Sequence, residues 1–326
     1  MAAIAALPAG REVVPELLVG AERFHVEPQT NLLDALLGAG IKVPSSCRAG
    51  SCHVCMVRCL QGEPGDAQPD ALTPEQRAQG WRLACQCQVL ADLCVEVFDP
   101  RRDGQEAAVV GCDWLSNSVL RLRLRVQRRL VYQAGQHVLL WTAEGVGRPY
   151  SLASVPNSDD FLEFHIDCRQ PGAFSDAARS FAVDQSLALG EISGGALHYD
   201  AQWQSRPLLL LAAGTGLAPL WGLLRAALNE GHSGPIRLLH LAHDQTQHYL
   251  AQPLAALAAS HPNLEVQLVT AADLPAALAE LRLVSRQTMA LICGSPASVE
   301  TFSRRLYLLG LPRNQMLADI FLSRAL

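Results

Sequence analysis

The chain is poor in positive charge and has almost no lysine. Lys42 is the one lysine, and 26 Lys and Arg residues stand against 31 Asp and Glu residues, giving a formal charge of −5. Proteins that bind nucleic acids use clustered positive charge, and no basic arm or Lys/Arg run occurs here. We therefore expect no nucleic-acid partner. Otherwise the composition, 49% hydrophobic and 17% charged, is typical of a globular protein.

Signals for secretion and membrane insertion are also missing. Residues 1–10 are apolar but follow no positive segment, so we do not expect a signal peptide. The uncharged stretch 207–224 is interrupted by Gly214, Gly216 and Pro219, which favours a buried strand, a turn and a helix over a membrane span. Ten cysteines without a secretion signal indicate a reducing compartment. We expect a cytoplasmic protein whose thiols serve a metal or catalysis.

Four cysteines form the most informative pattern. Cys47, Cys52 and Cys55 are followed by Cys85, which is the C-x4-C-x2-C…C spacing of plant-type [2Fe–2S] ferredoxins, where four thiolates hold two irons. Structural zinc sites usually close with a second C-x2-C or a His pair, so they fit less well. Cys87 is the alternative to Cys85, because strand alternation would place both on one face. The spacing predicts a one-electron carrier.

The length predicts two or three domains. In the first, we expect a hairpin formed by 13–19 and 23–27, followed by a helix over 32–39 that is capped by Thr30 or Asn31. A second helix should start at Thr73, and two closing strands should cover 82–89 and 94–98. The polar stretch 99–104 reads as a linker.

The rest of the chain changes pattern once. In 105–204, strand 119–126 alternates Leu with Arg and predicts one buried and one wet face, in a small antiparallel barrel. From 206 onward, apolar strands alternate with helices, which predicts a doubly wound parallel sheet that binds ligands at the carboxyl ends of its strands. The expected strands are 208–212, 237–242, 265–269 and 289–293, and the helices are 219–229, 250–260, 274–281 and 297–309.

Cys47–Cys55, together with the run Trp81–Gln86, closely resembles the ferredoxin domain of bacterial oxygenase reductases, such as those of methane monooxygenase and naphthalene dioxygenase. The resemblance covers nearly the whole chain. It implies a β-grasp [2Fe–2S] ferredoxin domain over 1–100, an antiparallel β-barrel that binds FAD over 101–205, and an NAD(P)-binding α/β domain over 206–326.

The flavin motif of that family, R-x-Y-S, is matched at Arg148-Pro149-Tyr150-Ser151. The resemblance implies that Arg148 binds the pyrophosphate, that Tyr150 faces the isoalloxazine ring, and that Ser151 bonds near its reactive edge. Gly172 and Ser175 then belong to a phosphate-binding helix start. FAD is preferred over FMN because the ferredoxin segment comes first.

Three further segments match the family's nucleotide site. Gly214, Thr215 and Gly216 match its nicotinamide loop, and Cys293-Gly294-Ser295-Pro296 resembles its C-G-P-P loop with Ser295 in place of the first Pro. Asp319 and Phe321 resemble its carboxylate-then-aromatic ending. The resemblance implies catalytic roles for Tyr150, Ser151, Cys293 and Asp319, and cofactor contacts for Gly294 and Phe321.

NADH is favoured over NADPH. The segment after the second strand of the last domain, 243–249, has no Arg or Lys to bind a 2′-phosphate, and Asp244 would repel one and accept from a ribose hydroxyl. His243 and His248 keep NADPH open as the less favoured alternative.

The resulting hypothesis is a monomeric reductase. NADH gives hydride to FAD, the electrons pass singly to the [2Fe–2S] cluster, and an oxygenase or its ferredoxin receives them. Two alternatives stay open: a reductase partner of a deoxysugar dehydratase, and a redox-sensing or zinc-stabilised binding protein without turnover. The sequence does not identify the terminal acceptor or its organic substrate.

Overall fold

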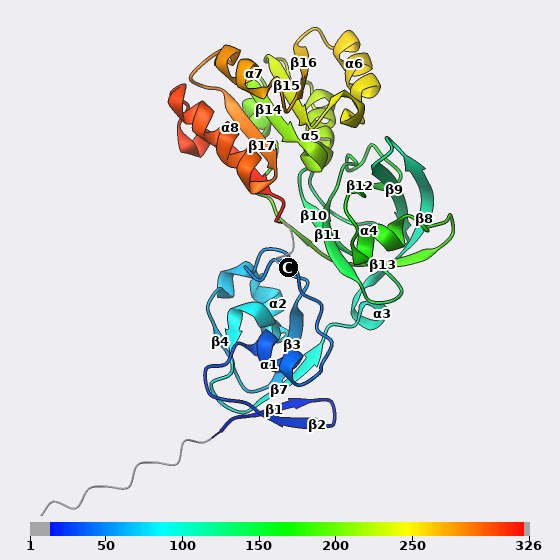
Figure 1. The fold of residues 1–326 in the computed structure, drawn as a ribbon, viewed down its shortest axis with the longest axis vertical. Coiled ribbons are helices and arrows are strands. Elements are labelled where there is room, and N and C mark those ends of the chain that lie inside the picture. The colour runs from blue at the N-terminus through cyan, green and yellow to red at the C-terminus, as the bar shows by residue number, and fades with distance from the viewer. Residues whose placement is uncertain (1–13, 323–326) are drawn as a thin grey trace, which may run out of the picture. The chain divides into compact units, whose positions relative to one another are not determined.

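The computed structural model describes residues 14–322 (Figure 1). The chain divides into two compact units, 1–98 and 99–326.

The first unit is a five-stranded mixed sheet with the order β2-β1-β7-β3-β5. The predicted hairpin is confirmed, and β1 also pairs in parallel with β7. Helix α1 buries Leu32, Leu33 and Leu36, and its N-cap is Asn31 rather than Thr30. The elements are β1 (Glu16–Val19), β2 (Glu22–His25), α1 (Leu32–Gly38), β3 (Met56–Gln61), β4 (Gly65–Asp66), α2 (Pro74–Ala78), β5 (Trp81–Leu83), β6 (Cys87–Gln88) and β7 (Leu93–Val97).

One prediction for this part of the chain is wrong. The strand expected over 82–89 is broken by a 3₁₀ turn, Ala84–Gln86, because Ala84 N–H bonds the Cys55 carbonyl (3.0 Å) and draws the backbone toward the cysteine loop. The segment 99–104, expected to be a linker, begins where the first unit ends, and it contains the short helix α3 (Pro100–Asp103), because the Asp99 carboxylate caps Arg101 N–H and proline starts the turn. The expected helix start at Thr73 is confirmed, with a full capping box to Gln76.

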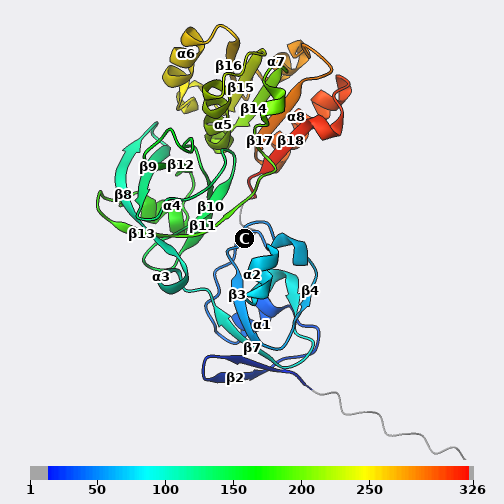
Figure 2. The same ribbon diagram turned by 180° about the vertical axis from the view of Figure 1, so that it is seen from behind.

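The first half of the second unit is a six-stranded antiparallel sheet that curls into a barrel (Figures 1 and 2). The predicted alternation in β9 holds: Leu120, Leu122 and Leu124 are buried, whereas Arg121 and Arg123 form ion pairs across the sheet. The elements are β8 (Gln105–Trp114), β9 (Val119–Val126), β10 (His137–Trp141), β11 (Gly147–Ser151), β12 (Leu162–Asp167), α4 (Ala173–Ala178) and β13 (Ser186–Ser193).

The second half of this unit is a parallel sheet with the order β16-β15-β14-β17-β18, which reverses next to β14. Helices α5 and α6 cover one face and α7 and α8 the other, each with its own apolar core, so the predicted doubly wound fold is confirmed. The elements are β14 (Leu208–Ala213), α5 (Leu217–Asn229), β15 (Ile236–Ala242), α6 (Ala251–Ser260), β16 (Leu264–Thr270), α7 (Leu274–Glu280), β17 (Met289–Gly294), α8 (Pro296–Leu308) and β18 (Met316–Ile320).

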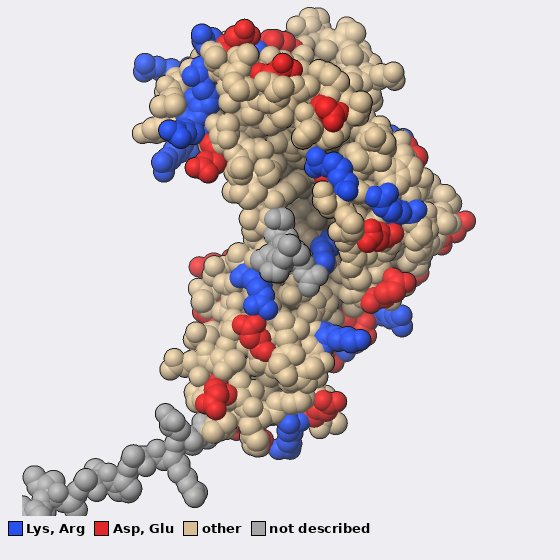
Figure 3. Space-filling model, in the orientation of Figure 1, with Lys and Arg blue, Asp and Glu red and all other residues tan. Residues whose placement is uncertain are grey.

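The uncharged stretch 207–224 forms β14, a 3₁₀ turn and α5, as expected. Within residues 14–322, no helix combines the length and apolarity that crossing a membrane requires. Positive side chains gather beside α8 on the face that Figure 3 shows, where Arg304 and Arg305 belong to this helix. Elsewhere on that face the two signs are interspersed, so the first unit presents no extended basic surface in this view.

Candidate functional site

The four thiols predicted to bind a cluster lie as two contacting pairs. Cys47 contacts Cys52, and Cys55 contacts Cys85. The hydrogen bond within each pair lowers the pKa of Cys47 to about 4 and that of Cys85 to about 6, and raises the pKa of both partners. Among residues 14–322, no three His, Cys, Asp or Glu side chains form a group that could hold a single metal ion. A two-iron cluster takes two protein ligands at each iron, which is the division observed.

The backbone of this loop is shaped to point N–H groups at sulfur. Arg48, Gly50 and His53 have φ of 52°, 77° and 55°, in the left-handed region. Ala49 N–H donates to Cys47 Sγ (3.3 Å), and Gly50 N–H bonds Cys85. The Gln86 side-chain amide also donates to Cys85 Sγ (3.2 Å). Such donors stabilise anionic sulfur and tune a cluster's potential, so these residues fit the group.

The structure separates the two candidates for the fourth ligand. The 3₁₀ turn that breaks the expected strand removes the shared face, and Cys85 contacts Cys55. Cys87 starts β6, pairs with Asp66 of β4, and is fully buried, and burial raises the pKa of its thiol. The geometry therefore favours Cys85, whose ligand role stays a prediction.

The residues of the predicted flavin motif, Arg148, Tyr150 and Ser151, lie on β11, the edge strand of the barrel sheet. The Tyr150 ring packs 4.9 Å from that of Phe174 on α4, and burial raises the pKa of Tyr150. Ser151 is buried and pairs in register with His137 of β10. The Ser175 hydroxyl donates to the carbonyls of Gln170 and Gly172, and Gly172 N–H donates to the Asp176 carboxylate (3.1 Å), so the phosphate contacts expected of Gly172 and Ser175 stay a prediction.

The predicted nicotinamide loop packs directly on the end of β17. Gly214–Gly216 forms a 3₁₀ turn, and a Cβ on Gly216 would lie 2.3 Å from the Cys293 carbonyl oxygen. Only glycine permits this approach. In the register of β17 with β18, Cys293 faces Asp319. The predicted nucleotide-site residues Gly216, Cys293 and Asp319 are thus brought together at one edge of the parallel sheet.

A half-buried histidine that the sequence reasoning missed, His137, lies near Asp319. Burial lowers the pKa of His137, and nearby Asp319 opposes that shift; burial raises the pKa of Asp319 in turn. His137 Nε2 is buried without a hydrogen-bond partner among the described residues. The signal in the sequence was its place at the start of a strand, directly after Gly135-Gln136. An unpartnered ring nitrogen opposite Ser151 fits a site that takes a polar ring such as a flavin.

A cavity of about 480 Å³ opens at the carboxyl ends of the parallel strands, where doubly wound sheets bind nucleotides. The lining includes Gly214, Thr215 and Phe321. It also includes Asp167, at the end of barrel strand β12, and Arg169, just after that strand. Arg169 donates to Asp167 and to Gln247 (3.2 Å), and the sequence reasoning had not included it. Its guanidinium is paired with the Asp167 carboxylate, so these two side chains bring opposite charges to the cavity wall.

Asp244 does not line this cavity. Its carboxylate accepts from Thr246 N–H and from the side chains of Thr246 and Gln247. The bonds from Thr246, together with the neighbouring His243, lower the pKa of Asp244. The predicted contact of Asp244 with a ribose hydroxyl stays a prediction. His243, beside it, does line the cavity.

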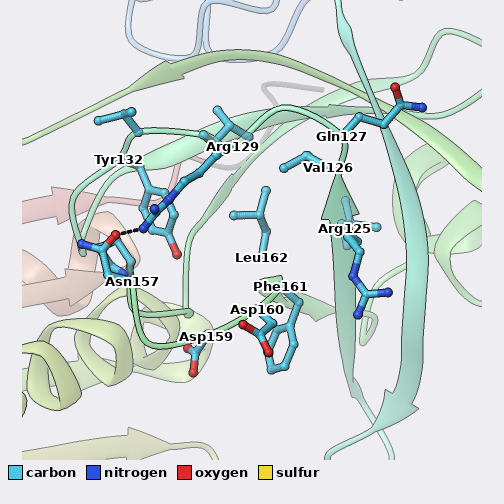
Figure 4. Close-up of a pocket in the computed structure, with 14 residues that line it drawn as sticks. Arg125, Val126, Gln127, Arg129, Tyr132, Asn157, Asp159, Asp160, Phe161 and Leu162 are labelled. Carbon is cyan, nitrogen blue, oxygen red and sulfur yellow. Dashed lines mark hydrogen bonds between the residues drawn. The ribbon is translucent and has the colours of Figure 1, made fainter.

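A second hollow, of about 590 Å³, lies on the barrel away from these residues (Figure 4). Arg129 donates to Asn157 across it, and Asp159 pairs with Arg225 of α5 at 2.7 Å. None of the predicted site residues lines it.

Three family models match successive parts of the chain. A 2Fe-2S iron-sulfur cluster binding domain matches residues 19–90, an oxidoreductase FAD-binding domain matches 107–199, and an oxidoreductase NAD-binding domain matches 210–304.

Similar proteins share this order over nearly their whole length. The reductase subunit of an aromatic O-demethylase from Amycolatopsis is 33% identical over 88% of this chain and 93% of its own. The reductase component of naphthalene dioxygenase/salicylate hydroxylase systems from Ralstonia is 30% identical over 94% and 98%. Among solved structures, the ferredoxin reductase of carbazole 1,9a-dioxygenase has a TM-score of 0.63 at 26% identity, covering 94% of this chain and 98% of its own.

Proposed function

We propose, because this chain belongs to the family of oxygenase reductase components with a fused [2Fe–2S] ferredoxin, that it carries electrons from NADH to a partner oxygenase or to that oxygenase's ferredoxin. The observation that carries the proposal is the pairing of four thiols in a loop of N–H donors, in the same chain as a flavin barrel and a nucleotide sheet.

When bound, FAD would supply hydride acceptance from NADH, and a [2Fe–2S] cluster would supply one-electron transfer. The chain supplies positions and charges. In the proposal, Arg148 and the start of α4 hold the pyrophosphate of FAD, and Ser151 and Asp319 border its reactive edge. Gly214–Gly216 and Cys293 form the wall against which nicotinamide lies, and Cys47, Cys52, Cys55 and Cys85 hold the irons.

We propose NADH as the electron donor. No Arg or Lys lies in the segment 243–249, and the Asp244 carboxylate adds negative charge where a 2′-phosphate would bind. Arg169 donates to Gln247 of this segment, but its guanidinium is already paired with Asp167, so it leaves little net positive charge for a 2′-phosphate.

The remaining assignments extend the same proposal. We place domain boundaries after residues 100 and 205, and the three family matches lie within these limits. We propose a monomer in the cytoplasm, which is where NADH is supplied. The ten cysteines, all free in the structure, fit a reducing compartment.

Purification under anaerobic conditions tests the function. We expect two irons, two acid-labile sulfides and one FAD per chain, and a visible spectrum with flavin bands and an iron–sulfur shoulder that NADH bleaches. Cytochrome c reduction should be at least tenfold more efficient, as kcat/KM, with NADH than with NADPH. A colourless protein that holds stoichiometric zinc would contradict the proposal.

A further inference from the structure

Five buried polar side chains lie between the barrel and the parallel sheet, within the second unit. Glu163 and His165 belong to β12, His240 belongs to β15, and His248 and Tyr249 precede α6. All five are less than a tenth exposed. Burying so many polar groups is costly unless each finds a partner, so their contacts decide what the group does.

The contacts form two hydrogen-bonded segments whose aromatic rings meet. In the first, Arg123 donates to Glu163 (2.8 Å), and His165 bonds Glu163 through Nε2 (3.2 Å) and the Tyr249 hydroxyl through Nδ1 (3.3 Å).

In the second segment, the Nδ1 atoms of His248 and His240 are 3.3 Å apart, and His240 Nε2 lies 3.1 Å from the Gly214 carbonyl oxygen. The rings of Tyr249 and His240 meet edge to face at 5.7 Å. The contacts thus run from the barrel to the first residue of the nicotinamide loop.

Each hydrogen in this group can be assigned from its neighbours. A carbonyl oxygen only accepts, so His240 carries its hydrogen on Nε2 and its Nδ1 accepts from His248 Nδ1–H. Glu163 is held ionised, so His165 Nε2–H donates to it and the Tyr249 hydroxyl donates to His165 Nδ1. When all three histidines are neutral, only one placement of their hydrogens satisfies these bonds. That placement leaves His248 Nε2 without a partner, as observed.

The loop at the end of this path is constrained from two sides. Gly214 has φ of 55°, and its carbonyl is held by His240. Two residues on, Gly216 rests against the Cys293 carbonyl with no room for a Cβ. The same turn lines the nucleotide cavity together with Asp167 and Arg169. A displacement of the Gly214 carbonyl therefore moves the wall of that cavity.

We propose that His240 and Tyr249 are positioning residues for hydride transfer: the buried contacts they make between the barrel and Gly214 fix the nicotinamide loop against the flavin. The inference rests on the proposed function. It assigns a role to side chains that do not line the nucleotide cavity, and it predicts that they control the geometry of the reactive complex more than the affinity for NADH. Small displacements of reacting groups cost rate steeply.

Two variants of His240 distinguish the effect of its hydrogen bond to Gly214 from the effect of its side-chain volume. His240→Leu removes the donor to Gly214, whereas His240→Gln keeps an amide N–H close to the place of Nε2. In rapid mixing of the holoprotein with NADH, we expect the limiting rate of flavin reduction to fall at least tenfold in His240→Leu, with the NADH dissociation constant changed less than threefold. The long-wavelength absorbance of the NADH–flavin complex should weaken in parallel. His240→Gln should recover the limiting rate to within threefold of the parent protein.

Tyr249→Phe removes a single oxygen and gives a test that survives if His240→Leu fails to fold. We expect a three- to tenfold loss of the limiting rate. Tyr307→Phe, at an exposed tyrosine of α8, is the matched control and should leave the rate unchanged. A normal limiting rate and normal absorbance in Tyr249→Phe, or in a folded His240→Leu, would overturn the proposal.

Histidine ¹⁵N shifts provide a readout apart from turnover. We expect the hydrogen on Nε2 in His165 and His240, and on Nδ1 in His248. A different pattern in a protein that NADH reduces normally would overturn the positioning network alone. Failure of NADH to reduce FAD in the parent protein would instead overturn the proposed function, whatever the tautomers.

Discussion

The two candidate sites of this chain are built in opposite ways. Three of the four cluster thiols come from nine consecutive residues, and local φ angles and N–H donors of the same loop prepare their environment. The flavin–nucleotide site draws on β10, β11, α4, β14, β17 and β18, which are brought together by sheet register. A site carried by one loop tolerates changes elsewhere, whereas a site assembled by register depends on packing far from its chemistry.

The largest expected effect comes from removing one thiol of the loop. Cys52→Ser breaks the Cys47–Cys52 pair, and because two ligands hold each iron, cytochrome c reduction should fall more than 100-fold. NADH-to-ferricyanide activity, which needs the flavin alone, should stay within twofold. Cys94→Ser, at a half-buried cysteine of the same unit outside the loop, should keep both activities. Loss of both activities in Cys52→Ser would show that the two sites are not separable.

The reciprocal change lies in the assembled site. Gly216→Ala places a Cβ about 2.3 Å from the Cys293 carbonyl oxygen, so the loop must move. We expect flavin reduction by NADH to slow about 100-fold, in line with the cost of misplacing reactants. Reduction of the cluster by dithionite should stay normal. Gly111→Ala, where the nearest atom would be 3.5 Å away, is the matched control. A fast Gly216→Ala variant would refute the placement of this turn.

Asn31 tests whether the stability of the cysteine loop depends on a residue outside it. Asn31 caps α1 through Oδ1 and donates from Nδ2 to the Cys85 carbonyl (2.9 Å). Asn31→Ala should lower the free energy of unfolding of the first unit by about 1–2 kcal/mol and hasten the loss of cluster absorbance in urea. Thr73→Ala removes a cap of similar worth that does not touch the loop. Equal rates of cluster loss in the two variants would count against a role for Asn31.

The same contrast explains what could be predicted from the sequence. The cysteine spacing and the alternation of strands and helices are local, so they predicted the cluster loop and the doubly wound sheet. The turn at Ala84–Gln86 depends on a hydrogen bond from Ala84 to Cys55, 29 residues earlier in the chain, and so the strand predicted over 82–89 was wrong. Tertiary packing alone gives His137, Arg169 and His240 their places in the candidate site. A single side chain in a strand or loop has no periodic pattern in the sequence that would predict such contacts.

As the pH falls, we expect the second unit, which holds the flavin–nucleotide site, to lose stability before the cysteine loop of the first unit does. Burial, with His248 beside it, holds the pKa of His240 at about 4, below the 6.5 of an exposed histidine, although the bond to Gly214 opposes this; burial also lowers the pKa of His165. Because the folded pKa is the lower one, stability is fully present above pH 6.5 and falls as the pH drops toward 4, at up to about 1.4 kcal/mol per pH unit for each such histidine.

The neighbouring carboxylate acts in a different range. Burial alone would raise the pKa of Glu163, yet bonds to His165 and Arg123 hold it at about 2, so its contribution is kept down to pH 4.5 and lost only below that. Between pH 6.5 and 4.5 the fall in the melting temperature of the second unit should therefore come from histidines. His240→Gln, which cannot titrate there, should flatten the profile. A parent-like slope in that variant would show that other groups set the acid sensitivity.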